Sequence, residues 1–213
     1  MNKTVRASFL PLAALLVSLV PVVPLRAQII SAIGVKGGIN FTNITFPVQA
    51  QPWNSKTGLI AGAFITFRIN EFLSIQPEFL ISEKGARWGG LSEGNFVTVT
   101  DEITYLDIPV LWKFNLPSLS KSVVQPHLYW GPCWSTKLIG TRATLMDEQI
   151  KEDKILNLND KDFSLIFGGG IDIKALTGKI SFDLRFGSSY SSIFKTKINR
   201  NKVISLLISY SFN

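Results

Sequence analysis

The sequence predicts an all-β protein, an eight-stranded antiparallel up-and-down β-barrel that crosses a membrane. Two observations favour this class. Apolar and polar residues alternate along nearly every candidate strand, and the spacers between strands alternate between short and long. An apolar outer band around a polar interior, with short turns on one rim and longer loops on the other, is typical of transmembrane barrels. The sequence offers no helix to cover the apolar face of a soluble sheet instead.

The alternation is clearest in the last two candidate strands, 179–186 and 202–212. A period of two places successive side chains on opposite faces of a strand. In 202–212 the apolar face has Ile204, Leu206, Ile208, Tyr210 and Phe212, and the other face has Ser205, Leu207, Ser209 and Ser211. In 179–186 the apolar face has Ile180, Phe182, Leu184 and Phe186, and the other face has Lys179, Ser181, Asp183 and Arg185.

Six earlier segments follow the same pattern and complete the set of eight: 32–42, 57–69, 72–84, 99–114, 123–136 and 162–174. Three of these strands contain prolines, which cannot donate to the strand ladder. The prolines in question are Pro77, Pro109, Pro126 and Pro132. We expect bulges or local register breaks to accommodate them.

The connections indicate which rim is which. Segments 70–71, 115–122 and 175–177 are short, whereas 43–56, 85–98, 137–161 and 188–201 are longer and are predicted to be loops, including the charged stretch 146–160. Short turns face the periplasm in such barrels, so an even strand number places both termini there. Aromatic residues favour the membrane interface. We place Phe67, Trp112, Phe114, Tyr210 and Phe212 near the periplasmic rim, and Trp130 and Trp134 towards the outer rim.

The first 27 residues have the features of a cleaved secretory signal peptide. Lys3 and Arg6 provide the positive start, an apolar stretch follows, and a cut after Ala27 leaves residues 28–213 as one barrel domain. A retained membrane anchor is the alternative, although three prolines disfavour a regular spanning helix there.

Composition argues against several classes of site. The chain has a formal charge of +7 but contains neither a basic helix nor a nucleic-acid-binding motif, so we expect no nucleic-acid partner. Cys133 is the only cysteine and His127 the only histidine, which excludes an intrachain disulfide and a multi-histidine metal site. The sequence therefore predicts no catalytic, cofactor-binding or metal-binding residues.

Several segments together resemble the PorT-type outer membrane β-barrel proteins of the Bacteroidetes group. Segment 34–41 (GVKGGINF) is similar to the family's opening strand, 73–80 (LSIQPEFL) with 83–85 (EKG) to its third strand, and 105–114 (YLDIPVLWKF) to its most recognisable segment. The triplet 168–170 and the ending 209–212 fit as well. The resemblance implies an eight-stranded barrel in the bacterial outer membrane. It implies no particular activity, because function does not follow from fold.

Two groups of charged residues are the candidate sites. Mixed charges on the inward faces predict an ion-paired network that fills a narrow lumen, with a narrow gated pore as the alternative: Lys36, Arg68, Glu78, Asp107, Lys113, Asp172, Lys174, Asp183 and Arg185. Four cations near the last outer loop predict contact with lipopolysaccharide, with a solvated basic loop as the alternative: Lys195, Lys197, Arg200 and Lys202. Loops 43–56 and 137–161 are the candidates for binding a protein partner.

The sequence thus favours a non-enzymatic outer membrane barrel with a structural, surface-interaction or export-assembly role. Two alternatives remain. A barrel hydrolase would use His127 with a nearby carboxylate, although no nucleophile elbow is present. A soluble lipocalin-like ligand binder would turn the apolar faces inward.

Overall fold

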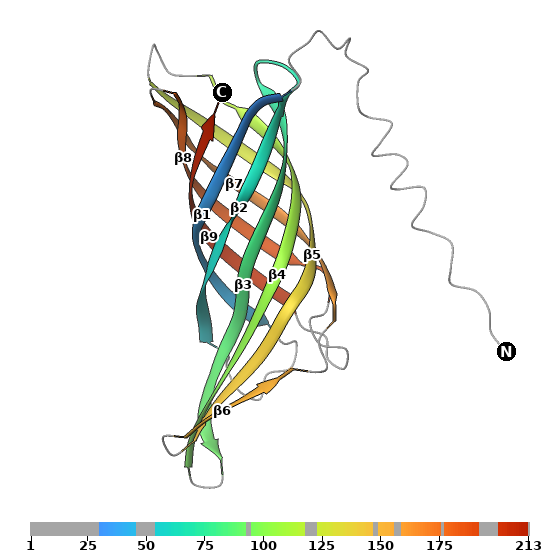
Figure 1. The fold of residues 1–213 in the computed structure, drawn as a ribbon, viewed down its shortest axis with the longest axis vertical. Coiled ribbons are helices and arrows are strands. Elements are labelled where there is room, and N and C mark those ends of the chain that lie inside the picture. The colour runs from blue at the N-terminus through green and yellow to red at the C-terminus, as the bar shows by residue number, and fades with distance from the viewer. Residues whose placement is uncertain are drawn as a thin grey trace, which may run out of the picture.

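The fold was analysed in a computed structural model that describes residues 30–45, 54–92, 95–117, 123–146, 149–155, 159–175, 177–191 and 200–212. The predicted signal peptide, 1–27, lies outside these residues. The described part contains nine strands (Figure 1): β1 (Ile30–Thr45), β2 (Asn54–Arg68), β3 (Leu73–Ser92), β4 (Asn95–Asn115), β5 (Val124–Met146), β6 (Gln149–Lys154), β7 (Lys161–Ala175), β8 (Gly178–Ser189) and β9 (Arg200–Phe212). None of the described residues forms a helix long and apolar enough to cross a membrane.

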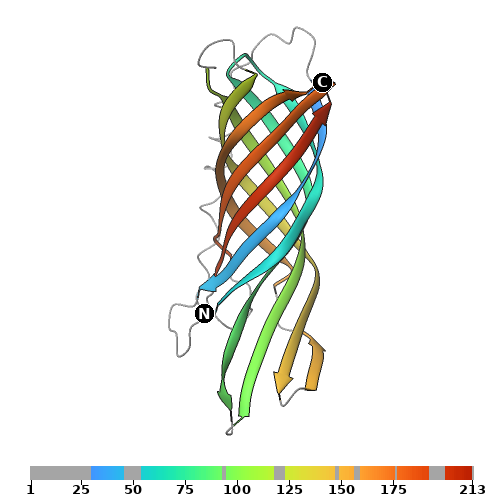
Figure 2. The same ribbon diagram turned by 90° about the vertical axis from the view of Figure 1, so that its left-hand side faces the viewer.

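Eight of the strands close into a barrel. Their order is β4-β3-β2-β1-β9-β8-β7-β5, and a further pairing of β4 with β5 completes the circle. Every neighbouring pair is antiparallel. The start of β1 and the end of β9 lie at the same end of the barrel as the short turns (Figures 1 and 2). The predicted eight-stranded antiparallel up-and-down barrel is confirmed.

The two faces of the sheet differ as the alternation predicts. Phe182 and Leu184 on β8 are 47% and 57% exposed, whereas Asp183 and Arg185 between them are 7% and 4% exposed. The apolar set therefore covers the outside and the charged set lies inside. The soluble lipocalin-like alternative, which needs the apolar set inside, is wrong.

The apolar outer face has a defined height. Its outward residues are almost all apolar over 33–41 in β1, 73–81 in β3 and 204–212 in β9. At the next outward position each strand becomes polar, with Asn43, Glu83 and Lys202. A membrane-spanning strand needs about 9–11 residues, so the band matches the hydrocarbon core of a bilayer.

Three strands continue well past this band, which corrects the predicted loops. Residues 85–92 and 95–98 extend the β3–β4 ladder, whose pairing runs to Ser92 opposite Asn95. In the predicted loop 137–161, β5 continues to Met146 and turns back as β6, which pairs with β5 alone. We call the part of β3–β5 beyond the band, together with β6, the extension; it projects from the end opposite the short turns (Figure 1). The strand predictions depend on an apolar face. Strands outside the membrane can pair through their backbones without one, so the sequence pattern does not identify them.

The structure also corrects two smaller predictions, the position of Trp130 and the effect of the prolines. Trp130 stacks on Trp112 with ring centroids 4.9 Å apart, so it lies in the half of the barrel near the short turns and not towards the outer rim. The ladder is interrupted next to Pro77 and Pro109, but pairing resumes without a change of register. The bulges fall elsewhere, for example between Thr104 and Tyr105.

Candidate functional site

The barrel interior brings together most of the charged residues that the sequence placed there. Six of the nine are buried and Lys113 is half-buried, whereas Arg68 and Lys174 are exposed. These two follow the inward parity of their strands, but they stand at the end of the barrel beside the short turns. We call this opening the short-turn mouth.

Glu78 on β3 is the centre of the interior network. Its Oε1 lies 2.7 Å from Lys36 Nζ on β1 and 2.8 Å from Gln76 Nε2, which donates to it. Arg185 Nη2 on β8 lies 2.9 Å from the other carboxylate oxygen, Oε2. A buried charge is costly unless it is paired and hydrogen-bonded, and here one carboxylate meets two cations.

His127 on β5 extends the network towards the short-turn mouth. Its Nε2 lies 2.7 Å from Asp183 Oδ1, and its Nδ1 lies 3.1 Å from Asp172 Oδ1. Asp183 Oδ2 in turn lies 3.6 Å from Lys36 Nζ, and Asp172 Oδ2 lies 3.0 Å from Lys113 Nζ. One continuous chain of contacts thus runs from Lys113 through His127 to Arg185. It contains three cations and three carboxylates in all, one of each on one side of the histidine and two of each on the other.

Aromatic and apolar side chains close the interior around this network. The Arg185 guanidinium lies 5.3 Å from the centroid of the Tyr129 ring, and Lys36 Nζ lies 5.2 Å from that of Phe64, which are cation–π distances. Apolar residues on the inward faces pack in two clusters, which together with Glu78 we call the central layer: Ile60, Leu80 and Leu207, and Leu111, Tyr129, Cys133 and Ile166. The sequence indicates these clusters only weakly: Leu207, for example, shares its face with Ser205, Ser209 and Ser211.

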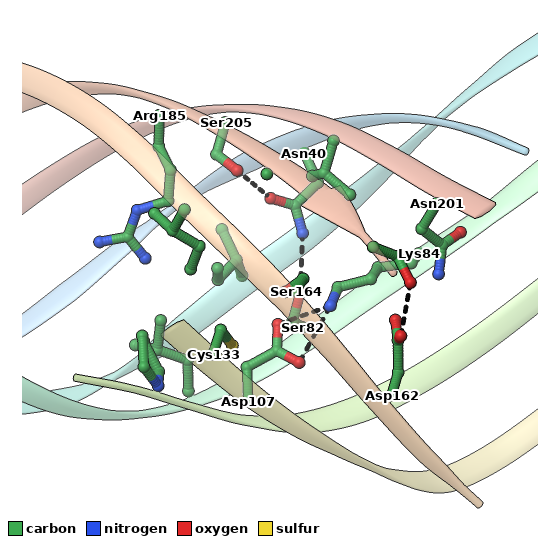
Figure 3. A pocket seen from close by; sticks show the side chains of 17 residues that line it. Asn40, Ser82, Lys84, Asp107, Cys133, Asp162, Ser164, Arg185, Asn201 and Ser205 are labelled. Atoms are coloured by element: carbon green, nitrogen blue, oxygen red, sulfur yellow. Dashed lines mark hydrogen bonds and ion pairs between the residues drawn. The ribbon is translucent and has the colours of Figure 1, made fainter. Parts of the chain in front are cut away.

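A second polar group lies in the interior near the extension (Figure 3). Lys84 Nζ is 2.8 Å from Asp107 Oδ2 and 4.9 Å from the Tyr105 ring centroid. Nearby, the Asn40 amide donates to Ser82 Oγ over 3.0 Å. Asn40, Ser82, Lys84 and Asp107 line a cavity of about 30 Å³. A second cavity, of about 40 Å³, lies towards the short-turn mouth. Since a water needs ~10–15 Å³, each cavity accommodates only a few waters.

The extension has its own ion pairs. Arg142 Nε and Nη2 donate to the two oxygens of Asp101 over 2.6 and 2.7 Å, and Asp101 is fully buried. This hydrogen bonding raises the pKa of Arg142 above its usual value. Lys56 Nζ lies 2.8 Å from Glu102 Oε1. These pairs were not predicted because Lys56 and Arg142 fall in the predicted loops 43–56 and 137–161.

The predicted lipopolysaccharide contacts are only partly visible. Lys195 and Lys197 lie outside the described residues, and Arg200 begins β9. Lys202 is exposed and shares the outward parity of Ile204, at the edge of the apolar band nearest the extension.

The surroundings of His127 bear on the hydrolase alternative. Both ring nitrogens face aspartates, and the side chain is buried in the interior. A catalytic serine would need one of these nitrogens as its base. Within the described ranges there is also no group of three histidine, cysteine or acidic residues placed to hold a metal ion.

A closed barrel with a lipid-height apolar band and a charged interior defines a transmembrane β-barrel protein. The family model described as "Outer membrane protein beta-barrel domain" matches residues 26–195, and the chain belongs to this family. The protein is therefore a bacterial outer membrane barrel.

Solved structures with a similar fold include three outer membrane proteins. Neisserial surface protein A is 14% identical, with a TM-score of 0.42, and the match covers 85% of this chain and 99% of that one. The attachment invasion locus protein Ail of Yersinia pestis is 11% identical, with a TM-score of 0.40 and coverages of 85% and 98%. OprG of Pseudomonas aeruginosa is 12% identical, with a TM-score of 0.48 and coverages of 85% and 96%. No curated protein matches the chain significantly.

Proposed function

We propose that this protein is a non-enzymatic barrel that presents the extension as an interaction surface outside the cell. The observation that carries this proposal is the contrast between the two parts of the molecule. Ion pairs and apolar side chains fill the central layer, whereas β6 in the extension is exposed along 150–154. The fixed barrel holds the extension well clear of the bilayer, and such surfaces on rigid scaffolds often carry binding functions.

Deleting the tip of the extension tests this proposal. A variant that lacks 143–153 should still insert and migrate as a folded barrel, but should lose whatever envelope or host protein the full chain captures in crosslinking from intact cells. A matched variant with the exposed charges Lys151 and Glu152 exchanged for each other keeps the length and the net charge. An unchanged crosslinking profile after the deletion would contradict the proposed role.

The orientation is part of the same proposal: both termini and the short turns face the periplasm. It is supported by the shared position of the β1 start, the β9 end and the short turns, and by the length of the strands at the other end. We also propose that residues 1–27 are cleaved, which leaves a mature domain from 28 to 213. Cysteine introduced at Lys151 should react with an impermeant maleimide on intact cells, whereas cysteine at Glu71 should react only after the outer membrane is opened. The native Cys133 is buried and should be replaced by serine in both. The reverse labelling would refute this orientation.

The finer resemblance to PorT-type proteins leads us to propose an export-assembly role as one form of this interaction. The segment 105–114 that carries the resemblance contributes Tyr105, Asp107 and Leu111 to the interior, so it supports the barrel and not a partner surface. Specific co-purification of secretion components with the full chain, lost in the variant without the extension tip, would support this role; co-purification with neither would oppose it.

Lipopolysaccharide contact at Lys195, Lys197, Arg200 and Lys202 is a further part of the proposal. Lys202 supports it, because it is exposed just beyond Ile204 at the edge of the apolar band, where lipid phosphates lie. Lys202→Gln should reduce lipopolysaccharide retained through purification, whereas Lys151→Gln on β6 should not. Equal retention in both variants would argue for a solvated basic loop.

We also propose that the protein has neither enzymatic activity nor bulk pore activity. The aspartates on both sides of His127 and the packed central layer support it. Purified wild-type protein should show no esterase or peptidase activity above that of His127→Ala, and no porin-scale conductance in planar bilayers. Hydrolysis abolished by the substitution would restore the hydrolase alternative.

A further inference from the structure

The short-turn mouth has a ring of cations on the lumen side of the wall. The members of the ring share the inward parity of buried interior residues and lie at or near the ends of four different strands: Arg68, Lys113, Lys174 and Lys179. Arg68 has the parity of the buried Phe64, and Lys174 has that of the buried Asp172. Contact with lipid phosphates on the outside of the barrel therefore does not account for these charges.

The four cations crowd one another. Lys174 on β7 lies directly opposite Lys179 on β8 in the ladder register. Like charges directly opposite each other destabilise a sheet. On the other side of the mouth, Arg68 and Lys113 flank β3 from its two sides, because each pairs with Ser74. Lys179 interacts electrostatically with Asp172 first, and then unfavourably with Lys113, Arg68 and Lys174.

Carboxylates balance this charge only in part. The carboxylates that line the cavity at this mouth are Asp172 and Asp183, and both already contact partners. Asp172 contacts Lys113 and His127, and Asp183 contacts His127 and Lys36. Arg68, Lys174 and Lys179 take part in none of the ion pairs formed by the described residues.

The cavity has suitable space and hydrogen-bond donors for an anion. Its volume of about 40 Å³ corresponds to roughly three water-sized positions, comparable with the oxygens of one small oxyanion. The ring members that line it are Arg68, Lys113 and Lys179, and they are accompanied by hydroxyl and amide groups: Ser74, Asn115 and Ser211. Charged donors of this kind form the strongest hydrogen bonds with phosphate and carboxylate groups.

We propose that the short-turn mouth is a binding site for an oxyanion, a phosphate or carboxylate group held between Lys179 on one side and Arg68 on the other, with Lys174 at the rim opposite Lys179. The bound anion relieves the repulsion between the two opposed lysines. It thereby stabilises the rim at which β7 and β8 meet. Because the central layer is packed, the anion binds at the mouth and does not pass through the barrel.

Titration of the refolded full barrel with inorganic phosphate tests the site. The protein is held in an amine-oxide detergent, which carries no phosphate, and chloride keeps the ionic strength constant. Phosphorus NMR and the thermal unfolding midpoint should both show saturable binding to the wild type. The double variant Lys174→Gln/Lys179→Gln should bind at least ~10-fold more weakly, the loss expected for one charged hydrogen bond. The matched control Lys151→Gln/Lys154→Gln removes the same charge from the exposed β6 and should bind like the wild type.

Three results would overturn the proposal: absence of binding, binding that does not saturate, or equal weakening in the double variant and its control. If the double variant does not fold, Lys179→Gln alone is the second test, with Lys154→Gln as its control. Nanodiscs distinguish the sources of the anion. Phosphate affinity that is the same with phosphatidylcholine and with phosphatidylglycerol supports a soluble ligand, whereas affinity lost only with phosphatidylglycerol shows that an anionic headgroup occupies the same site.

Discussion

Arg185 Nη2 and Glu78 Oε2 lie 2.9 Å apart and join β8 to β3 across the inside of the barrel. The two strands are not neighbours in the sheet, since β2, β1 and β9 lie between them. The pair therefore supports the wall from within, independently of the backbone ladder. Lys36 on β1 contacts the same carboxylate, so the contact joins three strands.

Glu78→Gln should strongly destabilise the barrel. The substitution removes the carboxylate that pairs with both Lys36 and Arg185 and leaves two buried cations short of a counter-charge. Loss of one member of a buried ion pair typically costs about 3–5 kcal/mol. Urea unfolding of the refolded protein, followed by tryptophan fluorescence, measures the change. Glu152→Gln on the exposed β6 is the matched control and should leave the midpoint unchanged; equal midpoints for the two variants would contradict an organising role for Glu78.

Leu184→Lys should impair membrane insertion, because it places a charge on the outer face within the apolar band. Leu184 is 57% exposed and lies opposite Leu206. A lysine facing lipid near the bilayer midplane costs about 2–4 kcal/mol, and the cost falls towards the interface. Folding into lipid vesicles, read from the shift in gel mobility on heating, compares this variant with Ser188→Lys at the edge of the band. If both variants fold equally well, the proposed height of the band is wrong.

The alternation in the sequence was sufficient to predict the barrel because a period of two assigns each side chain to one face without knowledge of any contact. It was not sufficient to predict which interior charges meet. Lys113 and Asp172 are 59 positions apart, and they meet because of the stagger between strands, which the sequence does not specify. The central layer was missed for a different reason. Leu80, Leu111 and Leu207 are apolar residues at inward positions, and a pattern analysis treats them as exceptions.

Gly168→Ala should destabilise the central layer by overpacking. A Cβ at Gly168 would lie 2.6 Å from Tyr129 Cζ and 2.7 Å from the backbone oxygen of Leu184. Both distances are shorter than a Cβ normally makes with any non-bonded heavy atom. Since Tyr129 also packs on Arg185, the ring has to shift away from its cation–π partner. Extra atoms in a packed interior typically cost about 1–3 kcal/mol. Gly187→Ala on β8 meets its nearest atom at 3.9 Å and should unfold like the wild type. Wild-type stability of both variants in the same urea titration would show that the central layer accommodates the added methyl group without overpacking.

Arg142→Ala should loosen the extension and leave the barrel intact. Asp101 is 0% exposed, and both of its oxygens accept from Arg142, so the substitution removes the partner of a buried charge. Hydrogen bonds to charged groups contribute about 1.5–3 kcal/mol, and the lower end applies here because the Arg142 side chain is 40% exposed. Amide hydrogen exchange should therefore rise in β4 near Asp101 and in β5 beyond Gly140, while β8 and β9 keep their protection. Lys151→Ala removes an ion pair whose partners are both largely exposed and should alter neither region. Faster exchange throughout the barrel would mean that the extension and the membrane-spanning part unfold as one unit.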